Sequence, residues 1–312
     1  VAIGCGCRTQ KARMNGAIVG LITDTGDRAG FSRFTFPVYR GLLQCSGSIA
    51  IGLWVRGERA GLALATLWPV RRDRAELLSI FVESSFRRLG FGVRLLEAMD
   101  QCLAEHGCRA IHASVTCSYE GSTVVERLLA RSDWCVVRIS AVLLHAEIAT
   151  ALQVPWLMPA RLPPGLEVIP WQAIDDSRRA EVRRRLRDDP LWAPATLNPF
   201  EGFGSISPCS VGMIHRGRVA GWSIAYERNS TTICRGRLWV ERDLQRMGRA
   251  IPLLAESLRR AGSLGIRNSY WSVAAENERM IRLLDRRIGP WLVSAKPVWE
   301  VTKQLSQEGR SA

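Results

Sequence analysis

Two short turns in the chain have the residue types that hold a pyrophosphate. They are Arg87-Arg88-Leu89-Gly90-Phe91-Gly92 and Gln245-Arg246-Met247-Gly248-Arg249-Ala250, and both fit [Arg/Gln]-x-x-Gly-x-[Gly/Ala]. A helix N-terminus presents unpaired N–H groups and the positive end of the helix dipole, which favour phosphate. Glycine lets the backbone approach the phosphates, and arginine adds charge-assisted hydrogen bonds. The turns therefore predict two pyrophosphate sites, although one such motif alone also fits an ordinary strand-to-helix turn.

The two turns belong to a longer internal repeat. Residues 78–92 align with residues 236–250 at a constant offset of 158 and without a gap. The identical pairs include Val82 with Val240, Glu83 with Glu241, Arg88 with Arg246 and Gly90 with Gly248. The same register continues as far as Glu120 and Glu278. Repetition at a fixed period indicates repeated structural units, so we expect two copies of one domain.

A proline-rich segment separates the two copies. Residues 153–165 contain Pro155, Pro159, Pro163 and Pro164, and proline sustains neither a helix interior nor a strand ladder. We therefore expect an N-terminal domain over 1–152, a linker over 153–165 and a C-terminal domain over 166–312. A chain of 312 residues is long enough for two domains of ordinary size.

Each copy shows the same order of expected elements around its turn. Strands are expected over 49–56, 60–68, 76–83, 111–115 and 136–146, and over 210–214, 219–226, 232–241, 268–273 and 298–305. Helices are expected over 90–106, 122–130, 248–261 and 276–286. Hairpins that lead into a strand–helix–strand unit predict an α/β (α+β) fold, in which each domain is a mixed, mostly antiparallel sheet flanked by helices.

Composition and charge narrow the classes of protein and partner. The hydrophobic content of 47% argues against a disordered chain, and the net charge of +14 favours anionic partners. Nine scattered cysteines do not resemble a disulfide framework, and Cys5-x-Cys7 has no second ligand pair nearby, so we expect no metal. The most apolar long stretch, 139–160, is too interrupted to span a membrane. Without a secretory signal in the chain, a cytoplasmic protein is expected.

With these turns and this repeat, the sequence resembles the GCN5-related N-acetyltransferase (GNAT) superfamily over roughly 30–150 and 165–306. The doubled layout is similar to that of mycothiol synthase. The resemblance implies a mixed sheet with a splayed central pair of strands, in which acetyl-CoA lies as the acyl donor. It also implies direct transfer of the acyl group, in a ternary complex, to a primary amine of a small molecule or peptide, with CoA as product.

The resemblance also implies the residues that bind the donor. Val82 and Val240 would end the strands whose backbone holds the pantetheine. Backbone amides of the two turns would hold the pyrophosphate, from Arg87, Arg88, Leu89, Gly90, Phe91 and Gly92 and from Gln245, Arg246, Met247, Gly248, Arg249 and Ala250. Asn277 matches an asparagine that stands near the cofactor in the family.

The transfer needs a base for the amine and an acid for the thiolate. In one branch of the family the base is a strand glutamate six residues before the Val82 position, where this chain has Glu76. Strand alternation predicts that Glu76 points with Val82. The second copy has Cys234 at this place. A solvated strand-end carboxylate remains an alternative for Glu76, and Glu83 and Glu241 are further alternatives for the base.

The acid is a tyrosine on the second helix in many relatives, and both copies depart from that pattern. Leu129 and Leu284 stand near the position, and Tyr119 is a possible substitute. Since neither copy is complete, we expect one degenerate half, and copy one, with Glu76, to be catalytic. The acceptor pocket is expected near Phe34, Phe36, Tyr39 and Arg40 in copy one, and near Trp192, Phe200, Glu201 and Phe203 in copy two.

The densest basic segment, 178–187, leaves alternatives open. It fits a solvated helix face, or a surface that contacts RNA, DNA or the 3′-phosphate of CoA. The net charge of +14 would also suit a Fem-like aminoacyl-tRNA-dependent transferase. Such enzymes generally lack the [Arg/Gln]-x-x-Gly-x-[Gly/Ala] turn, so its two copies here count against this alternative. The missing acid residues would suit a non-catalytic protein that binds acyl-CoA or nucleic acid.

Overall fold

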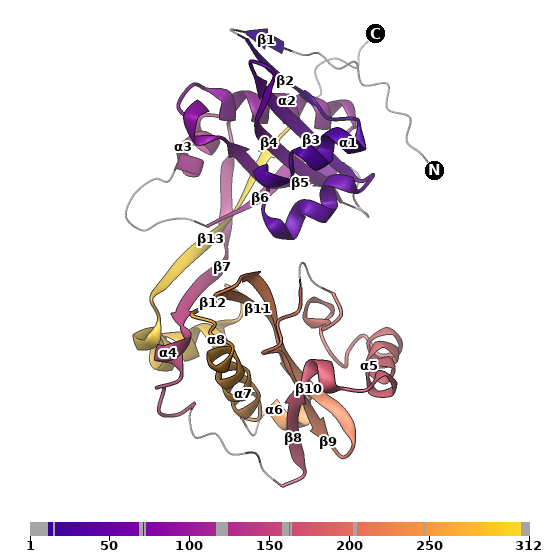
Figure 1. The fold of residues 1–312 in the computed structure, drawn as a ribbon, viewed down its shortest axis with the longest axis vertical. Coiled ribbons are helices and arrows are strands. Elements are labelled where there is room, and N and C mark those ends of the chain that lie inside the picture. The colour runs from indigo at the N-terminus through magenta and orange to yellow at the C-terminus, as the bar shows by residue number, and fades with distance from the viewer. Residues whose placement is uncertain are drawn as a thin grey trace. The chain divides into compact units, whose positions relative to one another are not determined.

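The structure, a computed structural model, describes residues 12–14, 16–68, 71, 73–116, 124–157, 162, 164–201, 205–245 and 248–306. The chain divides into two compact units. Unit 1 comprises Val1–Ser140 and Pro297–Ala312, and unit 2 comprises Ala141–Lys296. Each unit contains a mixed sheet with helices on both faces (Figure 1). The predicted fold class is therefore confirmed.

Unit 1 is built on a sheet with the strand order β1-β2-β3-β4-β5-β6-β13. Only the β5–β6 pair is parallel among these described strands. The elements are β1 (Ala12–Met14), β2 (Ala17–Leu21), α1 (Thr25–Gly30), η1 (Ser32–Phe34), η2 (Pro37–Gln44), β3 (Ser48–Val55), β4 (Glu58–Leu67), β5 (Arg74–Val82), η3 (Ser84–Phe86), α2 (Phe91–Glu105), β6 (Ala110–Thr116), α3 (Val124–Ala130), β7 (Cys135–Glu147) and β13 (Ser294–Gln304).

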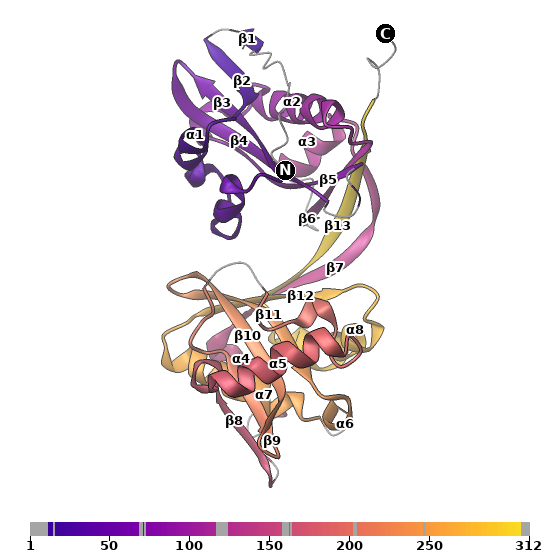
Figure 2. The same cartoon turned by 90° about the vertical axis from the view of Figure 1, so that its right-hand side faces the viewer.

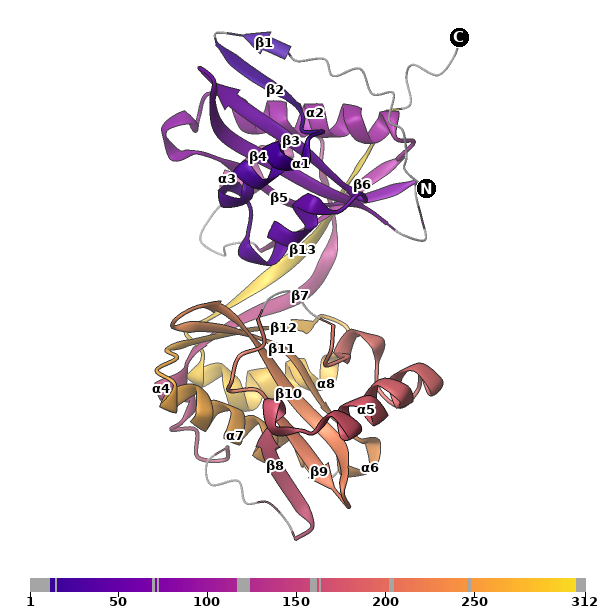
Figure 3. The ribbon, with the colours of Figure 1, turned by 45° about the vertical axis from the view of Figure 1, so that its right-hand side comes forward.

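Two cores cover the faces of the unit 1 sheet. On one face α2 buries Leu95, Leu96 and Met99, which recur at helical spacing, against β3 to β5. On the other face α1, η1 and η2 bury Phe31 and Phe34 with residues of β3 and β4. Figure 3 shows α1 and α2 on opposite sides of these strands. The sheet is thus fixed from both sides, which positions the end of β5.

Unit 2 repeats this plan with the strand order β7-β12-β11-β10-β9-β8, in which only β11–β12 is parallel among the described pairs. Helix α7 covers one face and α5 the other, as Figure 2 shows. The elements are α4 (Ile148–Ala151), β8 (Leu166–Pro170), η4 (Trp171–Ala173), α5 (Asp176–Asp188), η5 (Ala195–Leu197), β9 (Val211–His215), β10 (Arg218–Asn229), β11 (Thr232–Val240), α6 (Arg242–Gln245), α7 (Ala250–Ser263), β12 (Asn268–Ala274), α8 (Glu278–Leu283), the π-helix η6 (Leu284–Ile288) and η7 (Gly289–Trp291).

The last strand of each repeat joins the sheet of the other repeat. Strand β7 has 13 residues and is about 43 Å long at strand rise. Its first part lies next to β13 within unit 1, where Ser140 Oγ donates a hydrogen bond to the Val298 carbonyl at 3.2 Å. From Ala141 onward it pairs with β12 in unit 2. In turn β13 pairs with β6 from Val298 onward. The compact units therefore differ from the predicted ranges 1–152 and 166–312, which stay a prediction about the sequence repeats.

Both repeats have a β-bulge at the same place. The β4–β5 register passes from Leu64↔Ser79 to Ala65↔Leu77, which leaves Leu78 as the extra residue. The β10–β11 register skips Gly236 in the same way. Leu78 and Gly236 are related by the repeat offset of 158. A bulge changes which side chains share a face of the strand, and this has consequences for Glu76.

The pairing of β4 with the end of β5 depends on a glycine without space for a side chain. A Cβ added at Gly61 would lie 2.6 Å from the Phe81 carbonyl oxygen. We expect Gly61→Ala to lower the free energy of unfolding by about 1–3 kcal/mol through overpacking. Gly41→Ala is the matched control, because nothing lies within 4 Å of its added Cβ. Urea denaturation that gives Gly61→Ala the wild-type midpoint would contradict this close approach.

Candidate functional site

The central parallel strands separate in both units. In unit 1 the β5–β6 ladder ends at Glu76↔His112, so six residues of β5, 77–82, continue beyond it. In unit 2 the β11–β12 ladder ends at Cys234↔Tyr270, and 235–240 continue likewise. Backbone N–H and C=O groups on these edges need other partners. The splayed central pair that the resemblance implies is therefore present in each unit.

The unit 1 turn forms an exposed helix N-terminus at the end of the splayed strand. Arg88 and Gly90 have left-handed backbones, with φ of 64° and 80°, and α2 begins directly afterwards. The first bond of the helix runs from the Arg94 N–H to the Gly90 carbonyl at 3.3 Å, which leaves the preceding amides of the turn without helical partners. Arg87 Nε donates to the Val82 carbonyl at 2.8 Å and fixes the turn to the strand end.

The unit 2 turn keeps the same anchor with fewer available amides. Gln245 Nε2 donates to the Val240 carbonyl at 2.6 Å, as Arg87 does to Val82. The Gly248 N–H, however, donates to the Gln245 carbonyl at 3.1 Å, and the Ile251 N–H to the Gly248 carbonyl at 3.0 Å. The predicted residues Arg246 and Met247 lie outside the described residues. The described part of this turn therefore offers less to a phosphate than the unit 1 turn.

Glu76 does not point with Val82, contrary to the prediction from strand alternation. The bulge at Leu78 reverses the alternation between them. Val82 packs with the core under α2, whereas Glu76 lies on the η2 side, where its carboxylate raises the pKa of Tyr39 in addition to the larger effect of burial. Burial also raises the pKa of Glu76 itself. Glu76 is partly buried, so the alternative of a freely solvated strand-end carboxylate does not describe it.

His112 is the strand neighbour of Glu76 and is held as a neutral ring. Its imidazole stacks on Trp68 with centroids 5.2 Å apart, and Arg74 Nη1 lies 3.3 Å from its Nε2. Since a guanidinium only donates, Nε2 accepts and has no free lone pair for a proton. Burial and then Arg74 lower the pKa of His112. Glu76 is therefore the better placed proton acceptor of the two.

Unit 2 has no carboxylate at the equivalent place. Cys234 replaces Glu76, and burial raises the pKa of its thiol, which disfavours the thiolate. Tyr270 replaces His112 and stacks on His145 with centroids 4.3 Å apart. Glu241 is held by Arg185 Nη1 at 2.9 Å and by Trp192 Nε1 at 3.0 Å. The described residues of unit 2 thus lack the arrangement that surrounds Glu76.

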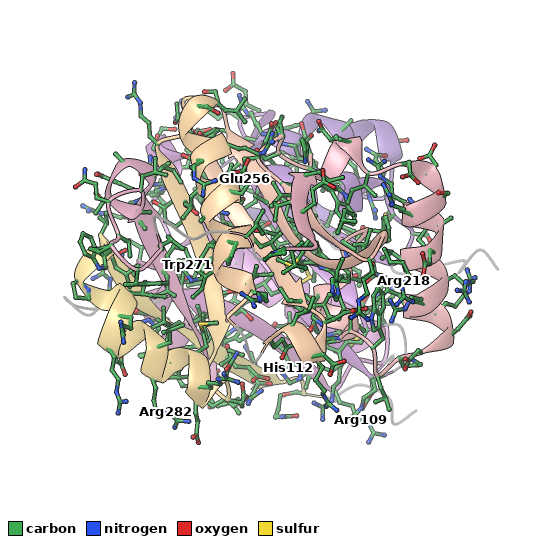
Figure 4. All side chains as sticks on the ribbon, turned by 90° about the horizontal axis from the view of Figure 1, so that it is seen from below. Arg109, His112, Arg218, Glu256, Trp271 and Arg282 are labelled. Carbon is green, nitrogen blue, oxygen red and sulfur yellow. The ribbon has the colours of Figure 1, made fainter. Side chains whose placement is uncertain are left out.

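The other predicted catalytic and donor residues have mixed outcomes. Tyr119 lies outside the described residues, so its role as acid stays a prediction. Asn277 caps α8, where its Oδ1 accepts from the Met280 N–H at 3.1 Å. Glu83 caps η3 through a bond from the Ser84 N–H at 3.2 Å. Leu129 and Leu284, which stand near the position of the family's tyrosine, are buried core residues. On the neighbouring helix α8, the labelled side chain of Arg282 points away from the ribbon (Figure 4).

The expected acceptor residues divide into core and surface. Phe34 is buried, whereas Phe36 is 53% exposed and packs edge-on against Tyr39 with centroids 6.1 Å apart. In unit 2, Trp192 and Phe200 belong to an aromatic cluster around Trp222. Phe203 lies outside the described residues. In unit 1 a pocket next to Glu76 is therefore best sought beside Phe36 and Tyr39.

The basic segment on α5 mainly contacts its own unit. Arg178 and Arg179 donate to the Gly217 and Trp171 carbonyls at 3.0 and 2.9 Å. Arg183 lies 4.1 Å from the Phe200 ring centroid, and Arg185 pairs with Glu241. Several arginines of α5 therefore stabilise the packing of unit 2. Sequence periodicity alone did not reveal these contacts.

Two features bear on metals and membranes. The described residues contain no group of three or more His, Cys, Asp or Glu side chains that could hold a metal ion. No helix in the described part of the chain is long and apolar enough to cross a membrane.

Comparisons with known proteins agree with this geometry. Residues 16–123 and 171–289 match the model of the acetyltransferase (GNAT) family. Among curated proteins, none matches the sequence. A tandem GNAT protein from the clavulanic acid biosynthesis pathway is similar in structure, with a TM-score of 0.63, 16% identity and coverage of 93% of this chain and 99% of that one. A GCN5-related N-acetyltransferase from Sphaerobacter thermophilus has a TM-score of 0.56 and 17% identity, with coverage of 94% of this chain and 97% of that one. A GNAT-family acetyltransferase from Colwellia psychrerythraea has a TM-score of 0.56 and 11% identity, with coverage of 92% of this chain and 99% of that one. At these identities the structural likeness concerns the fold.

Proposed function

The chain belongs to the acetyltransferase (GNAT) family, and we propose that unit 1 transfers an acetyl group from acetyl-CoA to a primary amine of a small molecule or peptide. The observation that carries this proposal is the position of Glu76. Its partly buried carboxylate lies at the last β5–β6 pair, where the strands separate, beside Tyr39. Unit 2 has Cys234 there, so we propose that unit 2 is the degenerate half.

The residues of unit 1 fit acetyl-CoA. The turn offers the amides from Arg88 to Gly92 and two exposed arginine side chains to a pyrophosphate. The Arg87 N–H, which was also predicted to bind it, instead donates to the Ser84 carbonyl at 3.3 Å. The edge of β5 beyond the β5–β6 ladder, over residues 77–81, offers backbone groups to the amides of a pantetheine arm. When bound, the donor supplies an acetyl group activated as a thioester.

Glu76 prepares the acceptor in this proposal. Its carboxylate accepts a proton from the ammonium or from the attacking amine, so that the nitrogen lone pair reaches the thioester carbonyl. A base whose pKa is raised toward neutrality abstracts a proton more effectively than an ordinary carboxylate. Transfer is direct and needs both substrates in place together. Tyr119 remains the proposed donor of a proton to the departing thiolate.

Release of CoA with a panel of amines tests the proposal. Purified full-length protein, acetyl-CoA and small polyamines, amino sugars, amino acids or peptide N-termini are combined, and free thiol is followed together with the mass of the product. We expect amine-dependent CoA release and a gain of one acetyl group by the acceptor. Acetyl-CoA binding without transfer to any amine would favour a binding protein, and salt-sensitive tRNA binding without CoA binding would favour the aminoacyl-tRNA-dependent alternative.

A further inference from the structure

A partly buried arginine lies at the base of the unit 2 splay. Arg235 is the first residue of β11 beyond the last β11–β12 pair. Its Nε donates to Ser269 Oγ of β12 at 3.0 Å, and its Nη1 donates to Ser257 Oγ of α7 at 2.8 Å. Its Nη2 is buried and has no hydrogen-bond partner among the described residues. The guanidinium is thus fixed by two neutral groups, with one donor nitrogen left over.

Unit 1 has an apolar core at the same three positions. The repeat offset of 158 relates Arg235 to Leu77, Ser257 to Met99 and Ser269 to Ile111. All three unit 1 residues belong to the buried cluster under α2. Both serines of unit 2 are buried as well, with exposures of 0% and 1%. The apolar trio of one repeat is therefore replaced by a cation and two hydroxyls that orient it.

The cation has no anionic partner within the described part of unit 2. No described carboxylate forms an ion pair with Arg235, and the other titratable group that acts on it is the buried thiol of Cys209. That thiol donates to Ser207 Oγ at 3.3 Å. Burial lowers the pKa of Arg235 to about 10, so the guanidinium stays charged at neutral pH. A buried donor nitrogen of a charged group that has no partner is costly to the fold, and a ligand carboxylate would offset that cost.

The position of Arg235 corresponds to the far end of a bound acyl-CoA. Arg235 and Val240 are five positions apart in β11, which is about 16 Å along the strand. An extended pantetheine arm that starts at the N-terminus of α7 covers a comparable length. The group beyond its sulfur then reaches the base of the splay, where β11 and β12 come together at Cys234↔Tyr270.

We propose that unit 2 binds an acyl-CoA whose acyl group ends in a carboxylate, the monothioester of a dicarboxylic acid, with Arg235 Nη2 as the donor to that carboxylate. This inference rests on the proposed function, because it places acyl-CoA in the splay. It gives unit 2 a donor-binding role that differs from that of unit 1. The neutral Leu77 at the same place in unit 1 suits an acetyl group instead.

Calorimetric titration of the full-length protein tests the inference with three probes. Succinyl-CoA carries the terminal carboxylate, butyryl-CoA has the same four-carbon chain without it, and acetyl-CoA reports on the proposed function. We expect succinyl-CoA to bind at least about 10-fold more tightly than butyryl-CoA, as a charge-assisted hydrogen bond in a buried site allows. Arg235→Leu should abolish that preference. Arg259→Leu, on the outer side of α7 where Arg259 pairs with Glu256, should keep it.

The outcomes separate the two proposals. Equal affinities of the wild type for succinyl-CoA and butyryl-CoA overturn the inference, and so does a preference for succinyl-CoA that persists in Arg235→Leu. In either case, binding of acetyl-CoA leaves the proposed function intact. Absence of binding by all three CoA esters overturns both. Arg235→Leu should fold, because it restores the apolar residue of unit 1. Arg235→Gln, which keeps a donor without the charge, is the second variant and should lose the preference as well.

Discussion

Replacement of Glu76 by glutamine should lower kcat for amine acetylation by about 10²- to 10⁴-fold, which is the range for loss of a positioned general base. Glutamine keeps the size of the side chain and cannot accept the proton. The dissociation constant of acetyl-CoA should stay unchanged, because the phosphate turn and the strand edge do not include Glu76. Steady-state kinetics and calorimetry separate these two effects. Glu83→Gln is the matched control and should keep wild-type kcat, and a large loss in that variant would assign the base to Glu83.

The pH dependence of the same variant follows from the raised pKa of Glu76. Activity of the wild type should fall as the pH decreases through that raised pKa, and the corresponding inflection should be absent from Glu76→Gln. For stability the sign is opposite. When the folded-state pKa of a carboxyl is raised, the free energy of unfolding of the protein falls as the pH rises from the unfolded-state pKa through the folded-state pKa. Glu76→Gln should therefore be more stable than the wild type above that range in chemical denaturation.

Much of the fold follows from the sequence because the repeat gives each element twice. The long helices and the hairpins have strong periodic patterns, and the offset of 158 aligns them without ambiguity. The anchor between Arg87 and the strand end recurs at Gln245, which explains why the first position of the motif accepts either residue. Both side chains reach the carbonyl of the preceding valine. The motif thus contains structural as well as phosphate-binding positions.

The orientation of Glu76 could not be predicted because a bulge leaves no mark in an alternating pattern. The single extra residue at Leu78 reverses which residues share a face. Leucine is apolar and fits either side of the sheet, so its type gives no warning. In the second repeat the same position is Gly236, where an added Cβ would lie 2.5 Å from the Tyr226 ring. That glycine is the only local signal for the bulge that the sequence offers.

The exchange of the last strands is also invisible to local sequence patterns. Strands β7 and β13 have the expected positions along the chain, but their partners are set by long-range packing. The one hint is length, since β7 has 13 residues and typical strands have about five or six. The linker predicted over 153–165 stays a prediction, because several of its residues lie outside the described part of the chain.

The role of the basic helix was open for a different reason. Periodicity places arginines on a helix but does not show what lies beside them. In unit 2, Glu241, Phe200 and two backbone carbonyls contact α5 from other elements. Arginine satisfies such mixed partners because its planar fork donates in several directions and stacks on rings. Contacts within unit 2 thus account for Arg178, Arg179, Arg183 and Arg185, whereas Arg184 and Arg187 are exposed and pair with Asp188 of the same helix.

Gly90→Glu should weaken acetyl-CoA binding to unit 1 by about 100-fold, or about 2.7 kcal/mol. Gly90 has a φ of 80°, a conformation that costs other residues about 1–2 kcal/mol. The new carboxylate would also stand beside the first amides of α2, where the pyrophosphate is proposed to lie, and would repel it. The loss should appear in calorimetry and as loss of the acetyl-CoA-dependent rise in melting temperature. Transfer activity should fall with it, because the donor no longer reaches Glu76.

Gly248→Glu provides the internal control for the assignment of the working half. Gly248 also has a left-handed backbone, with a φ of 68°, so the local strain is matched between the two variants. If unit 1 is catalytic, Gly248→Glu keeps amine acetylation near the wild-type rate while Gly90→Glu loses it. The reverse pattern would move catalysis to unit 2 and leave Glu76 without its proposed role. Equal loss in both variants would mean that the two halves depend on each other, which a single unit with its own base and its own phosphate turn does not require.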